Sequence, residues 1–132
     1  MSQKSVAEKL LITPNTTVWS PDPSRLDLIG PLPEGAHRAD GPEQATTAIL
    51  FAEDAGSLRD ILATHEDRLT PPKTLWIAYP KANRADINRD TLWPILGEYG
   101  MRPVGQVSVD EVWSAMRFRS LREGEAPFTG GR

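Results

Sequence analysis

Charged side chains are concentrated in a short segment that follows one of the most apolar stretches of the chain. Arginine binds carboxylate and phosphate groups through paired hydrogen bonds, and backbone N–H groups at a helix start near Thr91 would add donors for an anion. We therefore predict an anion-binding loop over residues 79–90. Its charged residues are Lys81, Arg84, Asp86, Arg89 and Asp90.

The same charges also permit a purely structural interpretation. A buried or half-buried arginine needs a charged partner, and Arg117 on a late strand is such a residue. In this interpretation the arginines neutralise nearby acids and tie the late hairpin to the loop. The groups concerned are Arg84, Arg89 and Arg117 with Asp86, Asp90 and Asp110.

The predicted ligand-binding set combines the loop with one aromatic residue and one arginine of the late strand. Tryptophan is enriched at binding surfaces, although core packing is the favoured explanation for Trp113. No catalytic residue, metal ligand or cofactor is predicted. The predicted set is Tyr79, Lys81, Arg84, Asp86, Arg89, Asp90, Trp113 and Arg117.

Other chemistry-bearing residues give weaker patterns. Asp22, Glu53 and Asp54 could hold a hard cation, but acids are also common where a helix starts. His37 and His65 have no partner motif. The chain has no cysteine, which excludes disulfides and thiol catalysis, and it has no G-x-G-x-x-G or P-loop sequence.

The elements that would position these residues follow from hydrophobic patterning. The continuous apolar runs at 46–52 and 74–79 are typical of strands that are covered on both faces of a parallel sheet. A further strand is predicted at 16–20 and a weak edge strand at 36–40. Helices are predicted after Asp22, after Ser57 and after Thr91, each of which can cap a helix.

The last part of the domain has strand character without an intervening helix. Residues 104–108 and 112–118 predict an antiparallel hairpin. Together the elements predict a single three-layer α/β domain, with a mainly parallel central sheet, helices on both faces and a C-terminal antiparallel hairpin. The predicted limits are a lead-in segment at 1–14, the domain at 15–122 and a flexible tail at 123–132.

Composition limits the classes of partner. The net charge of −3 and the pI of about 5.4 disfavour general nucleic-acid binding, which needs a basic surface. No apolar run reaches the roughly 20 residues that span a bilayer, and no signal-peptide pattern is present. We expect a cytoplasmic protein.

Three segments together resemble a family of small bacterial proteins that is classed as a domain of unknown function. They are LWIAYPK at 75–81, DINRD at 86–90 and VDEVWSAMRF at 109–118. The resemblance implies a compact α/β fold and no assigned activity. It also implies that Lys81, Asp86, Arg89, Asp90, Trp113 and Arg117 belong to one constellation.

Three functional hypotheses follow. The leading one is a non-catalytic module that binds an anionic small ligand or a protein partner through residues 79–90. The second is an enzyme that acts on a phosphate-bearing small molecule, with Lys81 and Arg89 holding the anion and Asp86 or Asp90 as base. The third is a structural or assembly protein, with a homodimer formed through the hairpin or a tryptophan face.

Overall fold

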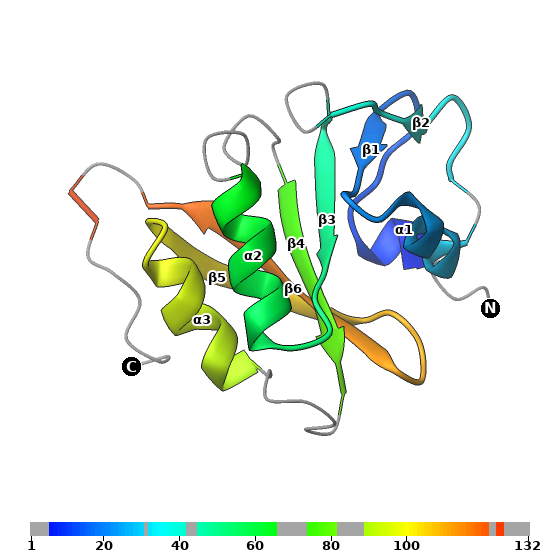
Figure 1. Cartoon of the computed structure of the whole chain (residues 1–132). Coiled ribbons are helices and arrows are strands. Elements are labelled where there is room, and N and C mark those ends of the chain that lie inside the picture. Colours follow the sequence, from blue (N-terminus) through cyan, green and yellow to red (C-terminus); the bar gives the residue numbers. More distant parts are fainter. Residues whose placement is uncertain are drawn as a thin grey trace.

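The computed structural model describes residues 6–30, 32–41, 45–65, 74–81, 89–121 and 124–125 (Figure 1). The elements are α1 (Val6–Lys9), β1 (Thr17–Trp19), the 3-10 helix η1 (Pro23–Ile29), β2 (His37–Arg38), β3 (Thr47–Phe51), α2 (Ala55–His65), β4 (Thr74–Pro80), α3 (Arg89–Gly97), β5 (Met101–Ser108) and β6 (Trp113–Ser120). Strands and helices alternate along the described chain except at β2–β3 and β5–β6, where two strands follow one another.

The strands form one six-stranded sheet in the order β2-β1-β3-β4-β6-β5. The first four pair in parallel, whereas β6 lies antiparallel to both β4 and β5. The predicted fold class is therefore confirmed. The chain order reverses between β1 and β3, because β2 lies on one side of β1 and every later strand lies on the other.

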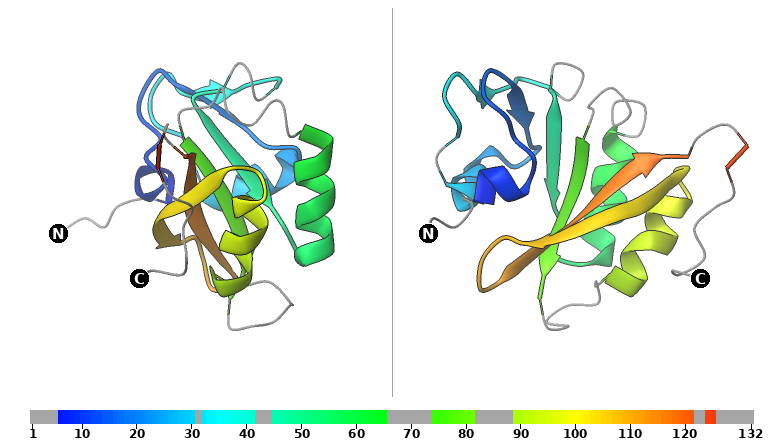
Figure 2. Two further views of the ribbon diagram at one scale, coloured as in Figure 1. Left: turned by 90° about the vertical axis from the view of Figure 1, so that its left-hand side faces the viewer. Right: turned by 180° about the vertical axis from the view of Figure 1, so that it is seen from behind.

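Both faces of the sheet are covered, which explains the unbroken apolar runs. Along β3, Ala48 and Leu50 face α2 and α3, while Ile49 and Phe51 face the layer formed by α1 and η1. All five residues of β3 are buried. Figure 2 (left) shows α1 and the α2–α3 pair on opposite sides of the sheet.

The N-terminal layer is fixed to the centre of the sheet by a buried hydrogen bond. The indole Nε1 of Trp76 in β4 donates to the backbone oxygen of Leu10 at 2.9 Å. Trp76 is almost fully buried and packs with Leu10, Ile12 and Ile49. This hydrogen bond satisfies the buried N–H donor of the tryptophan.

The predicted helix starts need correction. Asp54 caps α2, because its Oδ1 accepts the backbone N–H of Ser57 at 2.7 Å, so the helix begins two residues before Ser57. Asp22 makes no side-chain cap at η1 and pairs with Arg25 instead. The third helix begins at Arg89, two residues before the predicted cap, Thr91.

The β5–β6 ribbon is covered on one face by α3, where Met101, Met116 and Phe118 are buried. Seen from behind, its outer face lies in front of the other strands, with no described helix over it (Figure 2, right). Glu125 ion-pairs with Arg102 and Arg119 of this ribbon. The rest of the predicted tail at 123–132, apart from Gly124, lies outside the described residues.

Candidate functional site

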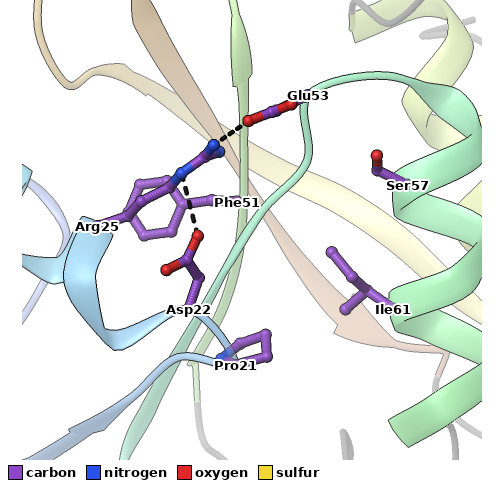
Figure 3. A pocket seen from close by; sticks show the side chains of 7 residues that line it. All are labelled: Pro21, Asp22, Arg25, Phe51, Glu53, Ser57 and Ile61. Atoms are coloured by element: carbon purple, nitrogen blue, oxygen red, sulfur yellow. Dashed lines mark hydrogen bonds and ion pairs between the residues drawn. The ribbon is translucent and has the colours of Figure 1, made fainter.

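A cavity of about 250 Å³ lies where β1 and β3 end (Figure 3). In open α/β sheets, ligands bind beyond the carboxyl ends of the strands, at the point where the strand order reverses. The cavity occupies that position, which is here called the β1–β3 pocket. Its lining comes from the segment after β1, the end of β3 and the first turns of α2, and consists of Pro21, Asp22, Arg25, Phe51, Glu53, Ser57 and Ile61.

Arg25 crosses the β1–β3 pocket and bridges its two acids (Figure 3). Its Nε lies 3.1 Å from Oδ2 of Asp22, and its Nη2 ion-pairs with Glu53. The carboxylates are 43% and 60% exposed, and exposed ion pairs contribute only about 0–1 kcal/mol. Arg25 can therefore leave either acid at low cost.

Aromatic side chains pack against the guanidinium group of Arg25. Its guanidinium carbon lies 5.0 Å from the ring centroid of Trp113. The rings of Trp113 and Phe51 meet edge to face at 5.6 Å. The start of β6, the end of β3 and the segment after β1 therefore form one cluster.

The chemistry of the pocket favours hydrogen-bond donors in a ligand. Asp22 and Glu53 supply two carboxylates against the single guanidinium of Arg25, and Ser57 adds a hydroxyl group. Phe51 and Ile61 supply apolar surface. Hydroxyl groups, an ammonium group or another cation suit this lining better than a phosphate does, because the carboxylates repel an anion.

Asp54 follows β3 but serves the helix. Hydrogen bonds from the backbone and side chain of Ser57 lower the pKa of Asp54, so the carboxylate is held as a helix cap. Within the described ranges no group of three or more histidine, aspartate or glutamate side chains could hold a metal ion. No helix among those ranges is long and apolar enough to cross a membrane.

Tyr79 in β4 and Lys81, which directly follows β4, are predicted site residues that contact the hairpin. The hydroxyl oxygen of Tyr79 accepts a hydrogen bond from the amide Nε2 of Gln106 at 2.5 Å, and Tyr79 is buried. Lys81 is half-buried, and its Nζ donates to Oγ of Ser108 at 2.5 Å. Both groups join β4 to β5 and lie outside the lining of the β1–β3 pocket.

Trp113 and Arg117 both lie on β6, but they contact different groups. Trp113 belongs to the cluster behind the β1–β3 pocket. Arg117 and Asp110 form no ion pair, and Oδ1 of Asp110 accepts hydrogen bonds from the backbone N–H groups of Val112 and Trp113 at 2.8 and 2.7 Å. Among the described residues Arg117 makes no ion pair. The structure therefore does not form the Arg117–Asp110 pair, while pairing of Arg117 with Asp86 or Asp90 stays a prediction.

The side chains of the four remaining predicted site residues lie outside the described part of the chain. Arg84 and Asp86 lie outside the described residues. Arg89 and Asp90 begin α3, but their side chains are not described. Their predicted anion site and their predicted pairing both stay predictions.

The sequence prediction missed the centre of the pocket. Arg25, Phe51, Ser57 and Ile61 were not predicted as site residues, while Asp22 and Glu53 were considered as ligands of a cation. One local signal was present, since Asp22 and Arg25 stand three residues apart directly after a strand. That spacing places opposite charges side by side on a helical turn.

Comparisons with known proteins identify the fold. No family model and no curated protein matches the chain. Three solved structures cover 98%, 98% and 96% of it. They are a protein in the NADB-Rossmann superfamily from Streptococcus agalactiae (TM-score 0.57, 14% identity, 72% of its length), a putative tRNA (m1A22) methyltransferase from Streptococcus pneumoniae (0.55, 12%, 74%) and the corresponding B. subtilis methyltransferase (0.51, 10%, 71%).

These likenesses establish a Rossmann-like fold. They contradict the leading hypothesis, a non-catalytic module that binds through residues 79–90, because two of these structures are named as methyltransferases. They agree better with the alternative hypothesis of an enzyme. The described residues add the β1–β3 pocket as a candidate site, while the predicted site at residues 79–90 stays a prediction.

Proposed function

We propose that the protein is an enzyme of the methyltransferase type, which binds a nucleoside-containing methyl donor in the β1–β3 pocket. S-adenosylmethionine is the first candidate. The observation that carries the proposal is the position of the pocket, at the reversal of strand order between β1 and β3. Two methyltransferases share the fold over almost the whole of this chain.

The pocket residues fit part of such a ligand. Asp22 and Glu53 would accept hydrogen bonds from ribose hydroxyl groups or from the ammonium group, and Phe51 and Ile61 would contact the adenine ring. When bound, the donor supplies an electrophilic methyl group. The chain's own residues would orient it and exclude water.

Two features limit the fit while Arg25 stays in place. A cavity of about 250 Å³ is smaller than the roughly 300–1,000 Å³ of typical small-molecule sites. The segment after β1, Ser20-Pro21-Asp22-Pro23, contains no glycine, so its backbone cannot approach a ligand as a glycine-rich turn does. Binding of the whole donor therefore requires Arg25 to move away from Glu53.

Calorimetry with S-adenosylmethionine and S-adenosylhomocysteine tests the proposal. We expect both compounds to bind the wild-type chain, and the double variant Asp22→Asn/Glu53→Gln to bind at least about tenfold more weakly, since each lost charged hydrogen bond costs roughly 1.5–3 kcal/mol. Asp27→Asn is the control, because Asp27 is an exposed acid that pairs with Arg38. Absence of binding by the wild-type chain, or equal binding by the double variant, would refute the proposal.

A further inference from the structure

The outer face of the β5–β6 ribbon carries three arginines. Arg102 and Arg119 are opposite each other in the strand register, and Arg117 lies two residues before Arg119 on the same face. This face continues the side of the sheet on which Trp76 is buried, since Trp76 is the register partner of Arg117. We call Arg102, Arg117 and Arg119 the arginine face.

The Arg102–Arg119 pair is arranged around an anion. Like charges directly opposite each other on antiparallel strands destabilise the pairing. Both guanidinium groups donate to the carboxylate of Glu125, with Arg102 Nη1 and Arg119 Nη2 each 2.8 Å from Oε2 and Arg119 Nη1 2.8 Å from Oε1. The carboxylate thus occupies a two-arginine site that also suits a phosphate.

Arg117 adds a third cation to the arginine face. It is half-buried, and within the described part of the chain it makes no ion pair. Its register partner on β5 is Gly105, and a Cβ atom at Gly105 would lie 3.9 Å from Nε of Arg117. Because Gly105 has no side chain, nothing from that position of β5 covers the guanidinium of Arg117. The guanidinium can therefore donate to an external acceptor.

The arginine face leads toward the β1–β3 pocket. Along β6, the residues on this face are Arg119, Arg117, Ala115 and Trp113, and successive members are about 6.8 Å apart. Trp113 in turn lies under Arg25 of the pocket. The two arginines of β6 and Trp113 beside the pocket thus lie on one side of the same strand, with the buried Ala115 between them. This arrangement suits a linear polyanion whose phosphates contact the arginines and whose reacting group enters the pocket.

We propose that the arginine face binds the phosphate backbone of RNA and so positions an RNA substrate; naming RNA as substrate rests on the proposed function. Arginine forks match phosphate oxygens, and phosphate contacts fix the register of a bound nucleic acid. The net charge of −3 repels RNA from the rest of the surface, which confines binding to this patch. Glu125 occupies the same arginines, and RNA binding displaces it.

Fluorescence anisotropy with a fluorescein-labelled tRNA, measured without a methyl donor, tests this surface. We expect Arg117→Ala to weaken binding about tenfold and to lower the slope of log affinity against log salt by about one, as loss of one phosphate contact does. We expect Glu125→Gln to strengthen binding about threefold, because it removes a competing carboxylate. The two substitutions therefore move the affinity in opposite directions.

The α2–α3 surface provides controls of equal charge. Arg59 and Glu98 pair there through two hydrogen bonds of 3.1 and 3.2 Å. Arg59→Ala and Glu98→Gln change the net charge as the test variants do, and we expect each to leave the affinity within about twofold, because exposed charges beyond a Debye length of about 8–10 Å are screened. Equal effects in the controls, stronger binding of anionic vesicles than of tRNA, or no binding of tRNA at low salt would overturn the proposal.

The two proposals can fail separately. If S-adenosylhomocysteine binds but tRNA does not, the RNA surface is refuted and the β1–β3 pocket stands. If tRNA binds with the expected variant pattern but neither donor compound binds, the methyltransferase proposal is refuted. In that case the arginine face remains an RNA-binding surface.

Discussion

The guanidinium carbon of Arg25 lies 5.0 Å from the ring centroid of Trp113. This contact joins the segment after the first strand to the first residue of the last strand. A cation over a tryptophan face contributes about 0.5–1 kcal/mol at an exposed site, which is similar to one surface ion pair. Arg25 is therefore held by several weak contacts, and a ligand can replace them one at a time.

The first prediction concerns Arg25 as a barrier to ligand entry. We expect Arg25→Ala to bind S-adenosylhomocysteine about threefold more tightly than wild type. In the wild-type chain Arg25 fills part of the β1–β3 pocket, and the share of molecules in that conformation reduces the apparent affinity. Calorimetry measures the change. Arg38→Ala is the control, since Arg38 forms a comparable exposed pair with Asp27. Weaker binding by Arg25→Ala would instead make Arg25 a ligand contact.

The second prediction concerns the cap of α2. Hydrogen bonds from Ser57 lower the pKa of Asp54 below its usual value of 3.8. The carboxylate is thus more acidic in the folded state, so its contribution is present above pH 3.8 and is lost as the pH falls through the folded pKa. We expect Asp54→Ala to lower Tm by a few degrees at pH 7, with the difference from wild type shrinking below pH 3.8.

Thermal unfolding followed by circular dichroism over a pH series checks the Asp54 prediction. Asp60→Ala removes an exposed acid from the same helix without removing a cap. A difference between Asp54→Ala and wild type that stayed constant down to the lowest pH would contradict the assignment of the cap to an ionised carboxylate.

The third prediction concerns the buried hydrogen bond of Trp76. Trp76→Phe removes the donor and leaves the carbonyl of Leu10 without its partner at a site where Trp76 is 2% exposed. An unsatisfied buried group costs about 1–3 kcal/mol, so we expect a loss of that size in the free energy of unfolding. Urea titration measures it. Trp93→Phe, at a half-buried position, should cost less, and an equal cost would show that ring size alone is responsible.

The fourth prediction concerns Tyr79, which the sequence assigns to a ligand site. Its hydroxyl group bonds Gln106 and the residue is 4% exposed, so we expect Tyr79→Phe to destabilise the fold by about 1 kcal/mol and to leave donor binding unchanged. A double-mutant cycle with Gln106→Ala should give a coupling energy of about 0.5–1.5 kcal/mol. A coupling near zero, or a loss of binding with normal stability, would contradict this role.

Most of the fold could be predicted from apolar patterning. The runs at 46–52 and 74–79 are buried strands because helices cover both faces, and consecutive strand patterns gave the hairpin. The helix starts were harder, since several residues in each segment can cap a helix. At α2 the choice fell on Asp54 instead of Ser57, because the carboxylate reaches the backbone N–H of Ser57.

The site was less predictable than the fold. Charge density drew attention to residues 81–90, but the β1–β3 pocket is built by contacts between distant segments. Arg25 and Glu53 are 28 residues apart, and Phe51 meets Trp113 only after β6 has paired with β4. The local sequence around each residue does not indicate such long-range contacts.

The hydrogen bond between Trp76 and Leu10 has a consequence for synthesis on the ribosome. Its two residues are 66 positions apart. At about 5–20 residues per second, translation needs roughly 3–13 s to cover that distance. During this interval the apolar side chains beside α1 can pack only against β1 and β3, so the nascent chain leaves them partly exposed to chaperones and proteases until β4 emerges.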